Sequence, residues 1–231
     1  MAIELDGVRV ATTMRTPGHD FELAVGFCHN EGLLGGAAVT SVRYCANGSA
    51  VASDFNVVSV STGGVAPEPR PRLTATTSSC GFCGHDEIDD LANDLPRVGG
   101  ASMSWKALAE APDLLRNGQT LFEATGAVHA AGVIEPNGEV SLVREDIGRH
   151  NAVDKLAGRM LLDGRLPATG LGLVLSGRAS FELAHKAWAA GFRAMVSVSA
   201  PTDLAVAVAE MAGIQLAGFA RDGAMNIYCE G

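Results

Sequence analysis

A repeated alternation of short apolar strands and amphipathic helices in the second half of the chain most constrains the fold. The elements predicted from hydrophobic periodicity follow one another as helix 151–162, strand 171–175, helix 180–190, strand 194–199, helix 202–211 and strand 214–219. Strands that are joined through helices pair in parallel by right-handed crossovers, and the helices then cover the sheet. The sequence therefore predicts an α/β fold whose mixed sheet is largely parallel.

Hairpin signals dominate the first part of the chain instead. Asp6-Gly7 separates two short strands within residues 3–14, and Asn47-Gly48 separates strand candidates at 39–45 and 57–61. Hairpins pair neighbouring strands in opposite directions. We therefore expect an antiparallel N-terminal extension on the same domain.

With 231 residues, the chain is long enough to bury a full core. We expect one domain, in which a hairpin-rich part, a cysteine-containing loop and an α/β core occupy residues 1–75, 76–104 and 105–231. The remaining elements are predicted as a helix that begins at Asp20, a helix at 105–116, and strands at 125–134 and 139–143.

The net charge excludes several classes of partner. At −9, it provides no positive field to hold nucleic acid or an anionic membrane, so a phosphate-bearing partner has to be bound locally by a few arginines and backbone amides. No apolar run reaches the ~18 residues that a membrane span requires, and the N-terminus lacks the basic and apolar regions of a signal peptide. We therefore expect a cytoplasmic protein that binds neither nucleic acid nor membrane.

Two of the five cysteines, Cys80 and Cys83, stand three positions apart beside glycines, in a stretch without a helical or strand period. We expect both on a flexible loop. A Cys-x-x-Cys pair can close a disulfide, ligate a metal, or provide a thiolate that attacks electrophilic sulfur. The other thiols, Cys28, Cys45 and Cys229, lie in apolar or strand-like stretches and are predicted to be core residues.

Charged residues gather where the predicted strands end. The segment 144–151 places Arg144, Glu145, Asp146, Arg149 and His150 in the joint between a strand and a helix. Ligands of α/β sheets bind at the carboxyl ends of strands, so this joint is a candidate site. Arg144 and Arg149 can hold a carboxylate or a phosphate, and His150 can exchange a proton near neutral pH.

Two further strand ends carry arginine and glycine. Ser176, Gly177 and Arg178 precede a helix N-terminus, where free backbone amides attract anions. After the last predicted strand, Gly223 permits close approach of a ligand while Arg221 faces an anion or a base. A simple turn and cap, or a surface hairpin, is the structural alternative at these places. Their position at successive strand ends makes them candidates.

A zinc site is a competing interpretation of the cysteine pair. His29-Asn30-Glu31 together with Cys80 and Cys83 resembles the zinc ligands and the acid of nucleobase deaminases. One histidine and two thiolates supply three zinc ligands and leave a fourth position for water. However, Ser79 stands where those enzymes have a proline, and His29 lies at an apolar helix end that packs simply into a core. Catalytic zinc is therefore the less favoured interpretation.

Segments along nearly the whole chain resemble the FdhD family. They are Met14–Asp20, Thr77–Gly84, Val143–Lys155, Ser176–Glu182, Ser199–Thr202 and Gly218–Tyr228. The long arginine and histidine motif among them is far more specific than a Cys-x-x-Cys pair alone.

The resemblance implies a sulfur carrier that formate dehydrogenase needs for its activity. A cysteine desulfurase would hand sulfur to the carrier, which would hold it as a persulfide on Cys80, with Cys83 assisting or resolving. The sulfur would then pass to the molybdenum or tungsten bis-pterin guanine dinucleotide cofactor before its insertion into formate dehydrogenase. The family also implies homodimers and a three-layer fold similar to that of cytidine deaminases.

The resemblance further implies where the cofactor binds. The family's guanine nucleotide site includes the C-terminal loop, which corresponds here to Phe219, Ala220, Arg221, Asp222, Gly223 and Ala224. Ala224 departs from the family at a position where a second basic residue is expected. The candidate residues at the other two strand ends are Arg144, Arg149, His150, Ser176, Gly177 and Arg178.

Three alternatives remain open on the sequence. A zinc-dependent, deaminase-like hydrolase predicts bound zinc and nucleobase turnover. A non-catalytic cofactor-binding chaperone predicts nucleotide binding that needs neither Cys80 nor Cys83. Reversible disulfide exchange predicts activity that needs both thiols and carries no sulfur.

Overall fold

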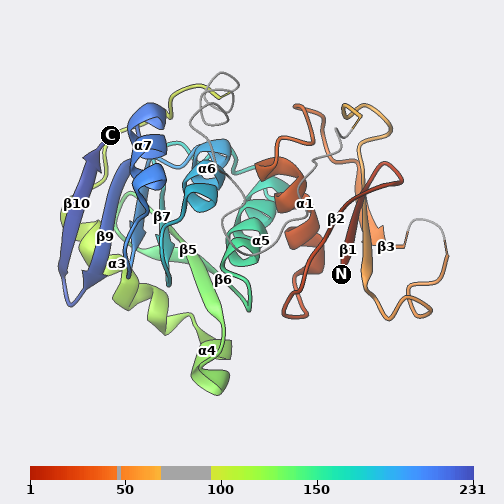
Figure 1. Ribbon diagram of the computed structural model, residues 1–231, viewed down its shortest axis with the longest axis horizontal. Helices are drawn as coiled ribbons and strands as arrows, with labels where there is room; N and C mark the ends of the chain where they lie inside the picture. The colour runs from red at the N-terminus through yellow and green to blue at the C-terminus, as the bar shows by residue number, and fades with distance from the viewer. Residues whose placement is uncertain (46–47, 69–94) are drawn as a thin grey trace.

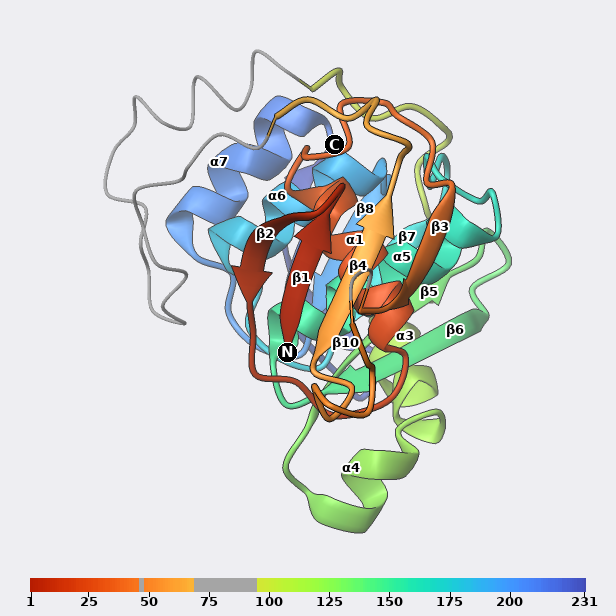
Figure 2. The ribbon, with the colours of Figure 1, turned by 90° about the vertical axis from the view of Figure 1, so that its right-hand side faces the viewer.

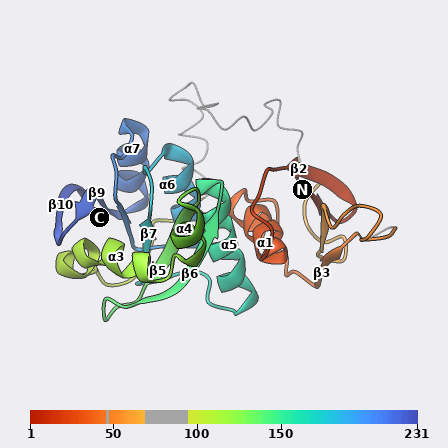
Figure 3. The ribbon, with the colours of Figure 1, turned by 90° about the horizontal axis from the view of Figure 1, so that it is seen from below.

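Two β-sheets, separated by helices, organise the part of the chain that the computed structural model describes, which is residues 1–45, 48–68 and 95–231. Seen from below, the helix α3 (Trp105–Asn117) is followed by the larger sheet, a layer of helices, the helix α1 (Asp20–Asn30) and the smaller sheet (Figures 1 and 3). None of the helices in these ranges combines the length and apolarity that crossing a bilayer requires.

The smaller sheet contains the N-terminal strands in the order β2-β1-β4-β3 (Figure 2). Its strands are β1 (Ala2–Leu5), β2 (Val8–Thr12), β3 (Ser41–Tyr44) and β4 (Val57–Ser61). The predicted hairpins are confirmed, because β1 pairs with β2 and β3 with β4 in antiparallel fashion. The prediction of a purely antiparallel extension is wrong, because β1 and β4 run parallel and form the centre of a separate sheet. This pairing joins strands far apart in the sequence, which turn signals do not reveal.

The larger sheet has six strands in the order β10-β9-β8-β7-β5-β6. They are β5 (His129–Ile134), β6 (Val140–Asp146), β7 (Gly172–Leu175), β8 (Ala194–Ser197), β9 (Gln215–Arg221) and β10 (Ala224–Glu230). The predicted crossovers are confirmed, because β7, β8 and β9 pair in parallel. The prediction of a largely parallel sheet is wrong, because β5 runs antiparallel to both its neighbours and β10 runs antiparallel to β9.

Helices cover both faces of this sheet. On one face, Leu108 and Leu115 of α3 meet Val174 and Val196 of the sheet. The other face packs against α5 (Arg149–Leu162), α6 (Phe181–Ala190) and α7 (Asp203–Ala212), and Leu156 is among the side chains in this contact. All of these side chains are fully buried. The apolar stripes of the helices and the apolar strands thus form the main core.

Two predicted boundaries near the sheet differ from the structure. Residues 125–134 were expected to form one strand, but a short helix, α4 (Thr120–Thr125), precedes β5 and ends at Gly126, whose φ is 65°. The Glu145 carboxylate accepts hydrogen bonds from the N–H groups of Leu121 and Phe122, both at 2.8 Å, and so caps this helix from a distant strand. Strand β6 also continues past the predicted end at 143 to Asp146, because its register with β5 extends to the His129–Asp146 pair.

The helices α1 and α5 cross with their backbones in direct contact. A Cβ atom added at Gly26 would overlap the backbone oxygen of Asp154, and one added at Gly158 would overlap the backbone oxygen of Glu22. Only glycine permits such an approach at the two positions. The crossing joins the two sheets, because α1 also packs on Val58 and Val60 of the smaller sheet.

A buried ion pair lies beside this crossing. The Lys186 ammonium on α6 contacts both Asp154 carboxylate oxygens, at 2.8 and 3.1 Å, and a Glu31 oxygen at 2.9 Å. The Asn30 amide donates a further hydrogen bond to Asp154 at 2.8 Å. Burial alone would lower the pKa of Lys186, but the Asp154 and Glu31 carboxylates outweigh it and raise that pKa. Lys186 therefore stays protonated, and its contacts with Asp154 and Glu31 link α1, α5 and α6.

Replacing either crossing glycine by alanine will destabilise the protein. In an unobstructed helix, Gly→Ala stabilises by roughly 0.5–1 kcal/mol, but here the methyl group meets backbone and we expect a loss of about 3 kcal/mol for Gly26→Ala or Gly158→Ala in urea unfolding. Gly99→Ala is the control, because its new Cβ would meet only Thr169 Cγ2, at 4.0 Å. A stabilised Gly26→Ala protein would contradict the crossing.

Removing the buried cation will cost more than removing the whole pair. Lys186→Met leaves the Asp154 carboxylate buried without its cation, and we expect the free energy of unfolding to fall by about 3–5 kcal/mol. The double variant Lys186→Met with Asp154→Asn should lose less than this, since no uncompensated charge remains. Equal losses in the single and double variants, measured by the same unfolding experiment, would show that the two groups are not coupled.

Candidate functional site

The carboxyl ends of β6, β7, β8 and β9 meet at one edge of the larger sheet, together with the first residue of β5. His129 opens β5 opposite Asp146, which ends β6. Ser176 directly follows β7 and makes two hydrogen bonds with Ala130 of β5. The Ser176 N–H donates to Ala130 O at 3.0 Å, and the Ser176 hydroxyl accepts from Ala130 N at 2.7 Å. The three predicted strand ends thus lie at the same edge, as α/β ligand sites do.

Several charged residues of the 144–151 motif bind other parts of the protein and so stabilise the fold. Arg144 donates hydrogen bonds to both carboxylate oxygens of Glu22 on α1, through Nε and through Nη2. Asp146 binds the fully buried Lys155 ammonium at 2.7 Å and accepts from Gly148 N at 2.9 Å. A ligand would have to compete with Glu22 for Arg144. The strand–helix joint itself is shorter than predicted and consists of residues 147–148.

The segment 13–16 is hydrogen-bonded to the same joint from the N-terminal side. The Asn151 amide donates to Met14 O at 2.7 Å and accepts from the Thr13 hydroxyl at 3.1 Å. Thr16 N donates to Asp146 at 3.0 Å, and the Thr16 hydroxyl accepts from the N–H at position 147 at 2.9 Å. The N-terminal segment therefore helps to fix the start of α5.

Buried polar atoms with weak or no hydrogen bonds indicate what this edge offers to a ligand. Arg149 Nε, His150 Nε2 and Ser180 Oγ are all buried and make no short hydrogen bond within the described ranges, and His150 and Ser180 instead face the Glu182 carboxylate. They lie at the starts of α5 and α6, where the N-cap residues make no side-chain hydrogen bond to the backbone N–H groups of the first turn. Native proteins rarely leave such groups unsatisfied, so their clustering favours a bound polar ligand.

Glu182 and His129 complete this cluster. Glu182 Oε2 lies 3.9 Å from His150 Nε2, and this imidazole lowers the pKa of Glu182 to about 2 against the opposing effect of burial. Burial lowers the pKa of His129, and electrostatic interactions with Arg149 and His150 lower it further. His129 is therefore neutral near pH 7 and offers one donor and one acceptor nitrogen. Gly177 leaves room for it, since an added Cβ would lie 3.2 Å from His129 Nδ1.

A pocket of about 640 Å³ opens at this edge, between the strand ends and the helices α3 and α4. Three of the predicted residues line it, namely Ser176, Ala220 and Arg221. The sequence did not single out the others, which include Asp113, Arg116, Gln119, Phe122 and His129. The polar residues among them read as the solvated face of a helix or the start of a strand, so no sequence pattern distinguished them.

The predicted C-terminal loop is a hairpin. Asp222 and Gly223, with φ of 51° and 73°, form the two-residue turn between β9 and β10. Phe219 lies in β9, as the predicted strand 214–219 has it, and the surface hairpin that the sequence left as the alternative is confirmed. The C-terminal loop is shorter than the resemblance implies, because Ala220 and Arg221 still belong to β9 and Ala224 opens β10. Asp222 and Gly223 adopt the positive φ angles that a two-residue hairpin turn requires, so the pairing of β9 with β10 continues up to the turn.

Phe219 has an unusual backbone conformation in this hairpin. Its φ is 54°, which is rare for a bulky residue, and its side chain is 43% exposed. A bulge in the β9–β10 pairing accommodates it, and its N–H donates to Ser199 O at 3.2 Å. Such conformations cluster at functional sites.

Two exposed arginines at this edge have no acidic partner among the residues that the structure describes. Arg178 and Arg221 make no hydrogen bond or ion pair with the residues that the structure describes. With Arg149, they provide local positive charge on a chain of net charge −9. This agrees with local, rather than global, attraction of an anion.

The cysteine pair lies outside the described residues, as both Cys80 and Cys83 fall in the range 69–94. Of the competing zinc site, only His29 and Glu31 are described. His29 is largely buried against the backbone of Ala189 on α6, and burial lowers its pKa. In the described ranges, no group of three or more histidine, cysteine or acidic residues is arranged to hold a metal.

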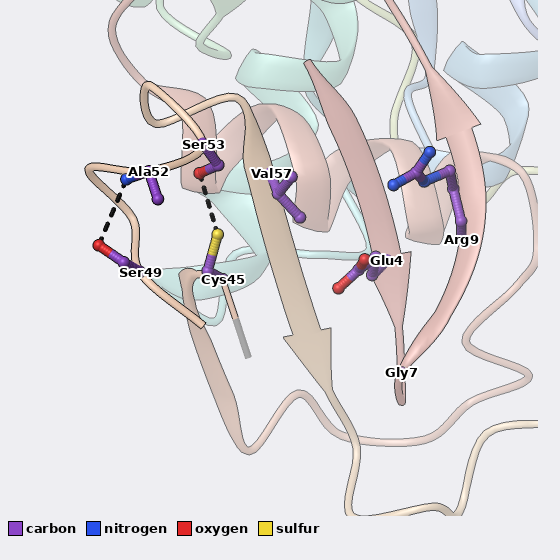
Figure 4. A pocket seen from close by; sticks show the side chains of 8 residues that line it. All are labelled: Glu4, Gly7, Arg9, Cys45, Ser49, Ala52, Ser53 and Val57. Carbon is purple, nitrogen blue, oxygen red and sulfur yellow. Dashed lines mark hydrogen bonds between the residues drawn. The ribbon is translucent and has the colours of Figure 1, made fainter. Parts of the chain in front are cut away.

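A smaller pocket of about 350 Å³ lies on the outer face of the smaller sheet (Figure 4). Glu4 and Arg9 project from its strands, and Cys45 Sγ lies 3.0 Å from the Ser53 hydroxyl. The helix α1 packs on the opposite face of this sheet, so the pocket is separate from the edge where the strand ends meet. None of the predicted site residues lines it.

A solved structure shares the fold. The crystal structure of a protein from Desulfotalea psychrophila, assigned as a formate dehydrogenase accessory protein, superimposes with a TM-score of 0.75. The match covers 99% of this chain and 85% of that chain, at 20% sequence identity. This likeness extends over both sheets and the helices between them.

Close relatives in sequence are described as sulfur carrier protein FdhD. The protein from Streptomyces avermitilis is 45% identical over 99% of this chain and 84% of its own length. The proteins from Mycolicibacterium paratuberculosis and Mycobacterium tuberculosis are 43% and 41% identical, each over 99% of this chain and 87% of their own length. A model of the FdhD/NarQ family matches residues 1–231. The chain belongs to the FdhD/NarQ family.

Proposed function

We propose that the protein is a cytoplasmic sulfur carrier that serves a formate dehydrogenase. It accepts sulfur from a cysteine desulfurase as a persulfide on Cys80 and transfers it to the molybdenum or tungsten bis-pterin guanine dinucleotide cofactor before insertion. The observation that carries this proposal is family membership along the whole chain, with relatives described as sulfur carriers. The cofactor is cargo in this scheme, and the protein acts as a homodimer.

The geometry of the sheet edge supports a phosphate-bearing cargo. The Arg149, His150 and Ser180 side chains at the starts of α5 and α6, and the Arg221 guanidinium that lines the 640 Å³ pocket, suit a pyrophosphate-linked ligand. The residues before α5 and α6 do not cap the first backbone N–H groups of these helices with their side chains, and such N–H groups can bind an anion. We also propose that this core, with two helices beginning at the ligand edge, is of the cytidine deaminase type.

The chemistry of the cysteines fits the assignment. Burial raises the pKa of Cys28 to about 12, so this thiol does not form a nucleophilic thiolate near neutral pH. Cys45 is hydrogen-bonded to Ser53, and Cys229 packs against the main core. In our proposal, Cys80 and Cys83 are the cysteines that handle the sulfur.

The transfer consists of two displacements at sulfur. The Cys80 thiolate attacks the terminal sulfur of the desulfurase persulfide; a new sulfur–sulfur bond forms and the desulfurase thiolate leaves with the electron pair of the broken bond. The Cys83 thiolate then attacks the inner sulfur of Cys80, closing a Cys80–Cys83 disulfide and releasing hydrosulfide to the metal. A dithiol reductant restores the two thiols.

Intact-mass measurement after incubation with a cysteine desulfurase and cysteine tests the proposal. The wild-type protein should gain one sulfur atom, which a reductant removes, on the peptide that contains Cys80. Cys80→Ala should abolish the gain, whereas Cys83→Ala should still accept sulfur but fail to release it. Cys229→Ala is the matched control and should load like the wild type.

Other results would contradict the assignment. Sulfur loading that persists in Cys80→Ala would remove Cys80 from its role. An unloaded protein that contains one zinc would support the deaminase-like alternative, and guanine nucleotide binding without any sulfur gain would support a non-catalytic chaperone. Metal content and nucleotide binding should therefore be measured on the same samples.

A further inference from the structure

The outer wall of the 640 Å³ pocket consists of residues from α3 and α4 that nothing above assigns to a role. On this wall, the Arg116 guanidinium lies over the Phe122 ring, 4.6 Å from its centroid. A guanidinium stacked on an aromatic ring presents a flat, electron-poor surface of the kind on which nucleobases stack. The wall therefore suits a planar heterocycle.

The wall is held rigidly to the sheet. The Glu145 carboxylate on β6 accepts hydrogen bonds from the backbone N–H groups of Leu121 and Phe122, each at 2.8 Å. At the turn between α3 and α4, a Cβ added at Gly118 would lie 2.8 Å from a Val143 methyl carbon, so this turn packs tightly on the same strand. The Phe122 backbone is thus fixed before any ligand arrives, which reduces the entropy lost on binding.

The pocket is lined by side chains of both negative and positive charge. Asp113 is the single acidic residue of its lining, and within the described ranges its carboxylate makes no hydrogen bond or ion pair. Of the two arginines of the lining, Arg116 belongs to the wall, whereas Arg221 belongs, with the Ser176 hydroxyl, to the strand ends. Because the Ser176 oxygen accepts from Ala130 N, its own proton is free to be donated. The strand ends suit phosphates, and Asp113 suits hydrogen-bond donors.

Guanine presents two adjacent donors on one edge, the ring N1–H and the exocyclic N2 amine, which a single carboxylate accepts together. Adenine presents no such pair of donors, and hypoxanthine lacks the exocyclic amine. We propose that Asp113 reads the guanine base of the dinucleotide cargo, while the Arg116–Phe122 stack supports the ring. This inference rests on the proposed function only in taking a guanine nucleotide as the ligand.

Calorimetric titration with GDP, IDP and ADP tests the inference. The wild-type protein should bind GDP about tenfold to a hundredfold more tightly than ADP, with IDP weaker than GDP. Asp113→Asn should lose that preference, because an amide cannot accept both donors, while its affinity for ADP stays within about twofold. Glu110→Gln is the matched control on the same helix: Glu110 faces Lys106 at 3.9 Å and does not line the pocket.

The outcomes separate this inference from the proposed function. Equal affinity of the wild type for GDP and ADP, unchanged selectivity in Asp113→Asn, or absence of nucleotide binding would overturn the inference, whether or not Cys80 loads sulfur. Selective GDP binding that depends on Asp113 would support it even if Cys80 accepts no sulfur. Sulfur loading of Asp113→Asn by mass should equal that of the wild type, which shows that the variant is folded.

Discussion

The contact of the α1 and α5 backbones at Gly26 and Gly158 determines how the rest of the molecule is arranged. No side chain separates the helices there, so neither can shift along the other without a clash. The smaller sheet packs on α1, and α5 packs on the larger sheet. Glu22, one turn before Gly26, reaches across to Arg144 at the end of β6. The crossing therefore fixes the relative position of both sheets and orients the strand end next to the candidate site.

The 144–151 motif divides into two groups with different tasks. Arg144, Asp146 and Asn151 are bound by partners from α1, from α5 and from the segment 13–16. Arg149 and His150, which begin the first turn of α5, have buried nitrogen atoms that make no short hydrogen bond to the residues that the structure describes. The first group holds the second in place, so the charged motif is mainly a support for two side chains. This is the relation of scaffold to ligand contacts that precise binding sites require.

Local patterns predicted the parts of the fold that local forces determine. The alternation from residue 151 to 219 gave the parallel crossovers, and the Asp6-Gly7 turn gave the first hairpin. Long-range contacts determined the parts that were missed. The helix α4 depends on Glu145, more than 20 residues away, and the pairing of Arg144 with Glu22 spans 122 positions. Asp113 and Arg116 look like an ordinary solvated helix face until the strand ends are placed beside them.

The hydrogen bonds between the segment 13–16 and the joint before α5 mean that both parts of the chain contribute to the structure around the site. Thr13, Met14 and Thr16 belong to the part of the chain that builds the smaller sheet, yet they bind Asp146 at the end of β6 and Asn151 in α5. The two parts are consequently not interchangeable modules. A chimera that joins the N-terminal part of one relative to the core of another has to keep the side chains that reach the backbone across this seam, and the Thr13 hydroxyl has to meet an acceptor such as the Asn151 amide.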